Sequence, residues 1–260
     1  MNQLELKKLA KICKKKILLS KKNKNYFSQP FKHIVIDNFL TPELAKKSMN
    51  SFPKLSDPNW THHKDKGIEV KSRLSWKSEF DIPENIIDVV RLFNSSDFLS
   101  SIGAVLSIPK LLPDPYFAGG GLNITEKGGH LDIHVDGNYH DPSGLNRRVN
   151  IILFLNRNWK KNWGGELGFY DNKGDELIKL ISPIFNRCVI FDTHDKSFHG
   201  LPNPINFPKN LPRKSIILYY YTVAKRNKQN VLISKPHSAL WKSKGLLDKK
   251  GKKTRKVYRN

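Results

Sequence analysis

The chain has 260 residues, enough for one substantial domain with its own hydrophobic core and barely enough for two. Hydrophobic residues make up 38% of it and aromatic residues 10%, which excludes an intrinsically disordered chain. Lys and Arg number 46 against 23 Asp and Glu, and the net charge of +23 is densest at the two ends. This excess either attracts nucleic acid or an acidic membrane surface, or reflects only a codon bias that enriches lysine.

The sequence contains no apolar stretch of transmembrane length, and its first residues are too rich in lysine for a secretory leader. Its two cysteines, Cys13 and Cys188, do not form a metal-binding pair, and Cys188 lies in an apolar run typical of a buried strand. We therefore expect an intracellular, cytoplasmic protein in a reducing compartment.

The first predicted element is a basic amphipathic helix over residues 2–20, which either packs against the domain or contacts an acidic surface. Its apolar positions, which stand among lysines, are Leu4, Leu9, Ile12 and Leu18. A short strand at 33–36 follows. The next predicted helix begins with Thr41 as N-cap and Pro42 at its first position. Residues 85–106 predict two helices separated near Asn94-Ser95-Ser96.

From about residue 110 the sequence changes to eight short apolar runs separated by Gly, Pro, Asn and Asp, with no helix between them. This pattern predicts a mainly β fold, an antiparallel jelly roll or barrel, with the N-terminal helices packed against it. We divide the chain into a basic segment (1–25), a domain (26–224, with the β core at about 110–224) and a basic C-terminal tail (225–260). The tail is weakly patterned, so we expect it to be peripheral.

The run GGHLDIHVDGNYH carries His and Asp at four alternate positions, which strand alternation would place on one face. His-x-Asp on a strand supplies two ligands of the two-His-one-carboxylate triad, which leaves three iron positions open. Two such pairs are present, and the third ligand must be a histidine from another strand. The residues concerned are His130 with Asp132, His134 with Asp136, and either His194 or His199 as the third ligand.

Arg213 and Ser215 open a later apolar strand and share one face by alternation. A guanidinium beside a hydroxyl at a barrel mouth suits the distal carboxylate of a dicarboxylic acid, which it can bind through two parallel hydrogen bonds. The residue types thus predict a metal site and an anion site in the same β domain.

Taken together, three runs resemble the prolyl-4-hydroxylase-like branch of the 2-oxoglutarate/Fe(II)-dependent oxygenase superfamily. They are GGHLDIHVDGNYHDPSGLNRRVNIILFLNRNWKKNWGGELGFYD, PIFNRCVIFDTHDKSFHGLPNP and RKSIILYYYT, and the resemblance covers about residues 115–224. It implies a double-stranded β-helix and favours the later His-x-Asp pair and the later histidine. One departure is Phe154, which stands where many relatives have a tyrosine.

The resemblance also implies the cofactors, Fe(II) and 2-oxoglutarate, with ascorbate as reductant, and the reaction, hydroxylation coupled to decarboxylation of 2-oxoglutarate to succinate. The iron ligands that it implies are His134, Asp136 and His199. The cosubstrate contacts are Arg213, with Ser215 and Asn123 as further candidates, and the substrate contacts are Asn138 and Tyr139.

Two other functions fit the same residues. A non-catalytic basic β-barrel would bind nucleic acid or an acidic surface through its basic ends. A cupin-like protein would use the metal without 2-oxoglutarate. If the protein is an oxygenase, the sequence leaves its substrate open among a protein prolyl residue, an amino acid, a glycan or lipid intermediate, and a nucleotide.

Overall fold

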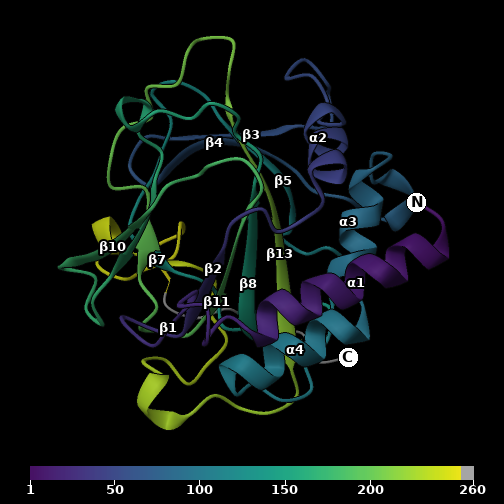
Figure 1. Ribbon diagram of the computed structural model, residues 1–260. Helices are drawn as coiled ribbons and strands as arrows, with labels where there is room; N and C mark the ends of the chain where they lie inside the picture. The colour runs from purple at the N-terminus through teal and green to yellow at the C-terminus, as the bar shows by residue number, and fades with distance from the viewer. Residues whose placement is uncertain (253–260) are drawn as a thin grey trace.

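Residues 1–252, the part of the chain that the computed structural model describes, form two antiparallel sheets, with helices along the outer side of the larger one (Figure 1). The α-helices are α1 (Gln3–Leu18), α2 (Pro42–Asn50), α3 (Ile86–Phe93) and α4 (Ser96–Leu106). Short 3-10 helices occur at Glu79–Asp81, Lys161–Trp163, Lys228–Asn230 and Lys242–Lys244.

The larger sheet has the strand order β1-β2-β11-β8-β13-β5-β4-β3, and β6 pairs with β4 beside this path. Its strands are β1 (Tyr26–Phe27), β2 (His33–Ile36), β3 (Thr61–Asp65), β4 (Glu69–Leu74), β5 (Gly121–Thr125), β6 (His130–Leu131), β8 (Asn146–Phe154), β11 (Arg187–Asp192) and β13 (Arg213–Thr222). The smaller sheet has the order β10-β9-β12-β7-β14. Its strands are β7 (His134–Val135), β9 (Leu167–Tyr170), β10 (Leu177–Ile181), β12 (His199–Gly200) and β14 (Leu240–Trp241).

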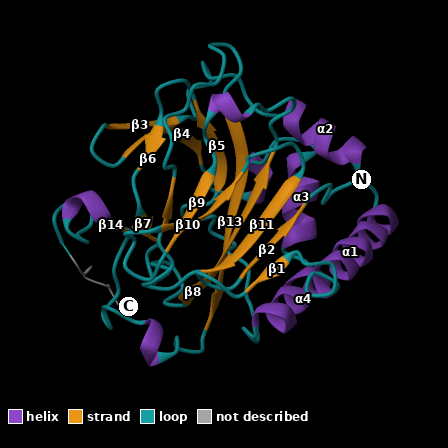
Figure 2. Ribbon diagram, turned by 60° about the vertical axis from the view of Figure 1, so that its left-hand side comes forward, coloured by secondary structure: helices purple, strands orange, loops and turns teal. Residues whose placement is uncertain are grey.

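This arrangement is the double-stranded β-helix that the sequence predicts, with helices packed on one side (Figure 2). Each of the eight predicted strand runs contains at least one strand. The helix that begins after Thr41 is confirmed, because the Thr41 hydroxyl accepts a hydrogen bond from Leu44 N at 3.4 Å. The separation of α3 from α4 is confirmed as well, since Ser95 caps α4 by accepting a hydrogen bond from Phe98 N.

Two apolar cores follow from strand alternation in the larger sheet. One face of β13, with Ile216, Leu218 and Tyr220, packs with the helices in the main core. The opposite face turns toward the smaller sheet, where a second core contains Phe154 and Phe191. The second face therefore lines the space between the sheets, where polar residues of the larger sheet meet the ends of β7 and β12.

The buried face of α1 differs from the predicted one. Leu9 is buried as expected, but Leu4, Ile12 and Leu18 are exposed. The helix instead buries Leu9, Ala10, Cys13 and Ile17, and Lys14 pairs with Asp97 of α4 at 2.7 Å. The sequence pattern was misleading because the buried face includes two small residues, Ala10 and Cys13, in place of three of the larger apolar ones. Of the two roles considered for this helix, packing against the domain is the one the structure shows.

The described part of the predicted C-terminal tail, residues 225–252, is not peripheral as expected, and residues 253–260 lie outside the described residues. Its strand β14 pairs with β7, so Leu240 and Trp241 extend the smaller sheet beside the predicted metal site. A buried carboxylate, Asp195, anchors the segment by accepting hydrogen bonds from Arg226 at 2.7 Å and from two backbone N–H groups at 232 and 233. No regular apolar periodicity accompanies these contacts, so residue patterns did not predict them. The proposed domain boundaries at 25 and 224 stay predictions.

Among the described residues, no helix combines the length and apolar character that crossing a lipid bilayer requires.

Candidate metal and cosubstrate site

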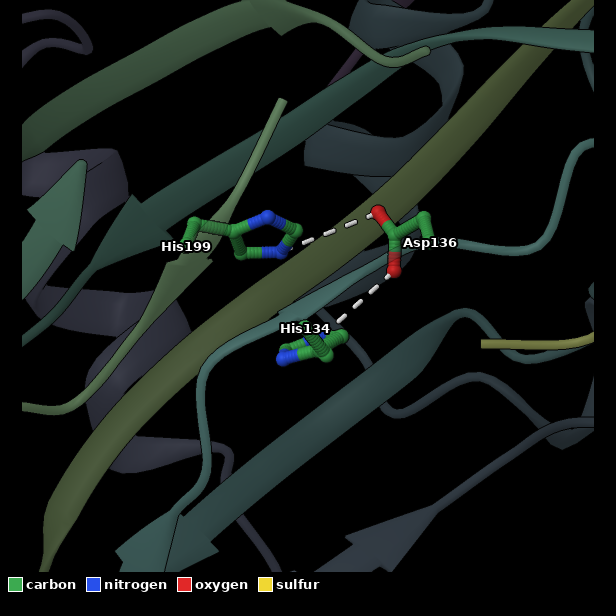
Figure 3. A group of neighbouring side chains, drawn as sticks. All are labelled: His134, Asp136 and His199. Carbon is green, nitrogen blue, oxygen red and sulfur yellow. Dashed lines mark ion pairs between the residues drawn. The ribbon is translucent and has the colours of Figure 1, made fainter. Parts of the chain in front are cut away.

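Three side chains from two strands and a loop meet between the sheets (Figure 3). His134 of β7 and His199 of β12 are direct partners in the smaller sheet, and Asp136 follows β7 by one residue. The two Nε2 atoms each lie 3.8 Å from a different oxygen of the Asp136 carboxylate. All three residues are buried, and their ligand atoms lie within 4.8 Å of one another.

Each imidazole is oriented by the backbone behind it. His134 Nδ1 lies 2.8 Å from Asp132 O, and His199 Nδ1 lies 3.0 Å from Ser197 O. A carbonyl oxygen only accepts hydrogen bonds, so each Nδ1 carries the proton and each Nε2 keeps its lone pair for a metal. Such outer hydrogen bonds fix the ring orientation in metal sites.

The electrostatics of the group favour metal binding near neutral pH. Burial, followed by the proximity of His199, lowers the pKa of His134 to about 3, so this imidazole is uncharged. Burial alone would raise the pKa of Asp136, but His199 and Arg147 hold it below the ordinary value. A neutral imidazole and an ionised carboxylate are the forms in which these groups bind a metal.

Three neighbours of the triad were not predicted from the sequence. Asn150 donates a hydrogen bond from Nδ2 to Asp136 Oδ2 at 3.2 Å, and Arg147 Nη1 lies 3.8 Å from Asp136 Oδ1. The indole of Trp241 stacks on His134, with ring centroids 4.6 Å apart. Asn150 did carry a signal, because it is a polar residue within the apolar run VNIILF. Trp241 lies in the weakly patterned tail, where no such contrast exists.

The rival metal ligands lie outside the group. The strand breaks at residues 132 and 133, and the Asp132 carboxylate accepts hydrogen bonds from Ser243 N and Oγ at 3.0 and 2.7 Å. The expectation that four alternate residues share one strand face is therefore wrong, because the strand is not continuous. His194 instead accepts a hydrogen bond from Lys196 N in a turn.

The two predicted substrate contacts lie in the loop after Asp136. The side chain of Asn138 is engaged with the C-terminal segment, because its Nδ2 donates to Ile233 O and Lys235 O and its Oδ1 accepts from His237 N. Tyr139 pairs through its backbone with Asn146 and is partly exposed. Their roles toward a substrate stay predictions.

The predicted cosubstrate residues lie together on the face of the larger sheet that turns toward the triad. Ser215 and Asn123 are direct partners across β13 and β5, and Arg213 stands two residues before Ser215. The buried Arg213 donates from Nε to Gly165 O at 2.7 Å, and its guanidinium lies 4.9 Å from the Phe154 ring centroid. Phe154 thus supports the guanidinium with its ring, where many relatives have a tyrosine.

Unpartnered polar atoms at this place fit a dicarboxylate ligand. Asn123 Nδ2 and Ser215 Oγ are buried without a hydrogen-bond partner among the described residues. Burial lowers the pKa of Arg213 to about 10, with Glu166 acting in the opposite direction, so the guanidinium stays charged near neutral pH. Buried donors without partners are costly, and a carboxylate placed among these groups would satisfy them.

The fold therefore belongs to a recognisable class, a double-stranded β-helix that places two histidines and one aspartate at its centre. A comparison with solved structures agrees. A prolyl hydroxylase from Trichoplax adhaerens, determined in complex with a hypoxia-inducible-factor peptide fragment, superposes with a TM-score of 0.60 at 16% identity, covering 85% of this chain and 94% of that one. A prolyl-4-hydroxylase from Pseudomonas putida gives a TM-score of 0.57 at 14% identity, covering 79% and 98%.

Sequence comparison shows similarity to one family over part of the chain. Residues 120–221 match the family model described as the 2OG-Fe(II) oxygenase superfamily, a range that contains His134, Asp136, His199 and Arg213. The prolyl 3-hydroxylase OGFOD1 of Mus musculus is 29% identical over 86 residues, which is 32% of this chain and 15% of that protein. This part of the chain is therefore similar to the 2OG-Fe(II) oxygenase superfamily, and the chain spans only a small part of the length of the mouse relative.

Proposed function

We propose that the protein is an Fe(II)- and 2-oxoglutarate-dependent dioxygenase that hydroxylates its substrate while 2-oxoglutarate is converted to succinate and CO2. The observation that carries this proposal is the convergence of two imidazole Nε2 atoms on opposite oxygens of one buried carboxylate. Bound iron and 2-oxoglutarate would supply the oxidising chemistry, with ascorbate keeping the iron ferrous. The two buried free thiols, Cys13 and Cys188, suit the cytoplasm that we propose as its location.

In this proposal the protein residues hold and orient the reactants. His134, Asp136 and His199 would hold the metal and would leave its other positions open to cosubstrate and oxygen. Arg213 binds the distal carboxylate of 2-oxoglutarate, and the donors of Ser215 and Asn123 lie beside it. The surrounding apolar rings, Phe154 and Phe191, exclude water and strengthen these electrostatic contacts.

Among the substrate classes compatible with the site, we propose a prolyl residue in a protein. Similarity to the mouse relative, a prolyl 3-hydroxylase, supports this choice. The other classes, an amino acid, a glycan or lipid intermediate and a nucleotide, serve as comparison substrates. Hydroxylation of proline in a protein would appear as a mass increase of one oxygen atom in a tryptic peptide.

The test is release of succinate from 2-oxoglutarate by the purified protein with Fe(II) and ascorbate. We expect turnover in the wild type and a loss of about 100-fold or more in His134→Ala and Arg213→Ala, since even outer partners of metal ligands contribute about 10- to 100-fold. Matched controls are His62→Ala and Arg157→Ala, which remove exposed side chains of the same types. Each variant is checked for a native melting transition.

Retained turnover in His134→Ala would disprove the metal assignment. A metal-dependent reaction whose rate is the same in Arg213→Ala as in the wild type would favour the cupin-like function instead. If the wild type does not turn over 2-oxoglutarate and binds polyanions with steep salt dependence, the non-catalytic barrel becomes the better hypothesis.

A further inference from the structure

A cavity of about 560 Å³ lies at one end of the larger sheet, outside the predicted metal site. Its walls come from the loop at 28–32, the turn after α4 at 106–108, the ends of β8 and β11, and the C-terminal segment at 226–230. This volume is within the range of small-molecule sites in proteins. None of the triad or cosubstrate residues lines it.

Strand alternation separates this cavity from the metal site. Arg147 and Phe191 face the triad, because Arg147 approaches Asp136 and Phe191 lies edge-on to His199 at 5.0 Å. Their sequence neighbours line the cavity, Asp192 by alternation along β11, and Arg148 because the pairing of β8 with β13 shifts register at this residue. One pair of strands thus carries side chains for two separate sites on its opposite faces.

Two charged groups of the cavity wall are buried and poorly satisfied. Arg148 Nε and Asp192 Oδ1 have no hydrogen-bond partner among the described residues, and they lie 3.9 Å apart. The Arg148 side chain is 13% exposed, so bulk water solvates little of it. A buried guanidinium nitrogen without a hydrogen-bond partner is costly, and a ligand group that accepts a hydrogen bond from Arg148 Nε would remove this cost.

The charges around the cavity favour an anion. The wall carries four cations, Lys32, Arg148, Lys196 and Arg226, against one carboxylate, that of Asp192. Arg226 is already neutralised by Asp195 at 2.7 Å, outside the cavity wall. The three remaining cations and the one carboxylate leave a net charge of +2. This charge balances the charge of about −2 that a phosphate monoester carries near neutral pH.

We propose that this cavity is a second binding site, for a small phosphate monoester that also carries a hydroxyl group. Arg148 binds the phosphate oxygens, and the ammonium groups of Lys32 and Lys196 complete the charge balance. Asp192 Oδ1, which lacks a partner, accepts a hydrogen bond from the hydroxyl of the same ligand. The site is independent of the proposed oxygenase chemistry, because none of the predicted metal-binding and cosubstrate-binding residues lines the cavity.

The test is isothermal titration of the full chain with glycerol 3-phosphate at physiological chloride concentration and near neutral pH. Glycerol serves as the uncharged reference. We expect saturable binding of one glycerol 3-phosphate per chain, with no measurable binding of glycerol. Arg148→Met should weaken the binding at least about tenfold, because a charged hydrogen bond contributes about 1.5–3 kcal/mol, more than the 1.4 kcal/mol that corresponds to tenfold.

Two control variants separate this site from the general basic charge and from the metal site. Arg157→Met removes an exposed arginine and His134→Ala removes a predicted metal ligand, and both should bind as the wild type does. If Arg148→Met does not fold, Lys196→Met replaces it, with at least a threefold loss expected. The proposal is overturned if the wild type shows no saturable binding, if the cavity variants bind as tightly as the wild type, or if Arg157→Met weakens binding equally.

Discussion

At the scale of single residues, Arg213 is the residue whose side-chain position is most tightly constrained. Its Nε is committed to Gly165 O, so the two remaining nitrogens of the guanidinium are the ones that face a ligand. Glycine is required at 165 for two reasons: its φ is +78°, and a Cβ there would lie 3.0 Å from Arg213 Cδ. The position of the guanidinium is therefore fixed by both backbone conformation and close packing.

Arg213→Lys should keep the charge and lose the planar fork that binds a carboxylate with two parallel hydrogen bonds. We expect KM for 2-oxoglutarate to rise about 10- to 100-fold, corresponding to the loss of one charged hydrogen bond, while kcat changes less. Steady-state kinetics with varied 2-oxoglutarate measure this. An unchanged KM would show that Arg213 does not contact the cosubstrate.

His33 links stability to pH. Burial lowers its pKa from 6.5 to about 4, although the hydrogen bond to Phe31 O acts in the opposite direction, and its Nε2 has no partner among the described residues. The unfolded chain takes up a proton at His33 below about pH 6.5, whereas the folded protein does so only below about pH 4. The free energy of unfolding therefore falls as the pH drops through this interval.

His33→Phe should remove this contribution. Between pH 6.5 and about 4, the slope of the free energy of unfolding against pH should be smaller in the variant by about 1.4 kcal/mol per pH unit, the value for one proton. Urea unfolding at a series of pH values measures the slope. His62→Phe, at an exposed histidine, is the control and should leave the slope as it is. The same slope in His33→Phe and the wild type would contradict the assignment.

At the scale of elements, α1 shows which features sequence patterns predict and which they do not. A helix near residues 2–20 was predictable from its apolar and basic residues, but its buried face was not. Leucine and isoleucine occur all around this helix, and which of them is covered depends on the position of α4. Cys13 and Ile17, both fully buried, are among the residues that meet the domain.

Ile17→Ala should cost about 2–5 kcal/mol of stability, because the truncation leaves a cavity in the main core. Ile12→Ala, one turn away on the exposed side, should change it by less than about 0.5 kcal/mol. Chemical denaturation of both variants and the wild type gives the comparison. Equal losses at the two positions would mean that the helix is oriented differently.

The strands of the core were easier to predict than the strands at its margins. β8, β11 and β13 are long, continuous apolar runs because both faces are covered, one by helices and one by the smaller sheet. β3 has the sequence THHKD, mostly exposed, and was missed because it lies at an edge and carries no apolar alternation. β14 was missed for a different reason, since only its pairing with β7 makes it a strand.

At the scale of the whole molecule, the site could be predicted only in part. The ligand types and their order along the chain were visible in the sequence, whereas the environment of the triad depends on pairings between distant segments. Asn150 lies beside Asp136 because of β8, and Trp241 lies beside His134 because of β14. Such contacts require the register of two strands, which residue patterns alone do not specify.

Metal binding should stabilise the entire domain, because the ligands come from segments that are apart in the unfolded chain. At a concentration of Mn²⁺ about 100 times its Kd, the stabilisation is about 2.7 kcal/mol, or a rise in Tm of roughly 5–10 °C. Differential scanning calorimetry of the metal-free protein with and without Mn²⁺ tests this. His134→Ala should show no rise, and a rise of the same size in that variant would place the metal elsewhere.

The stacking of Trp241 on His134 also bears on biosynthesis. A nascent chain that has not yet reached residue 241 lacks the indole that covers this imidazole, and the backbone hydrogen bond from Trp241 N to Leu247 O needs a few residues more. Until then one side of a metal-binding ring is open to water and to competing ions. The indole thus joins the site only after the three predicted ligands have been synthesised, the last of them some forty residues earlier in the chain.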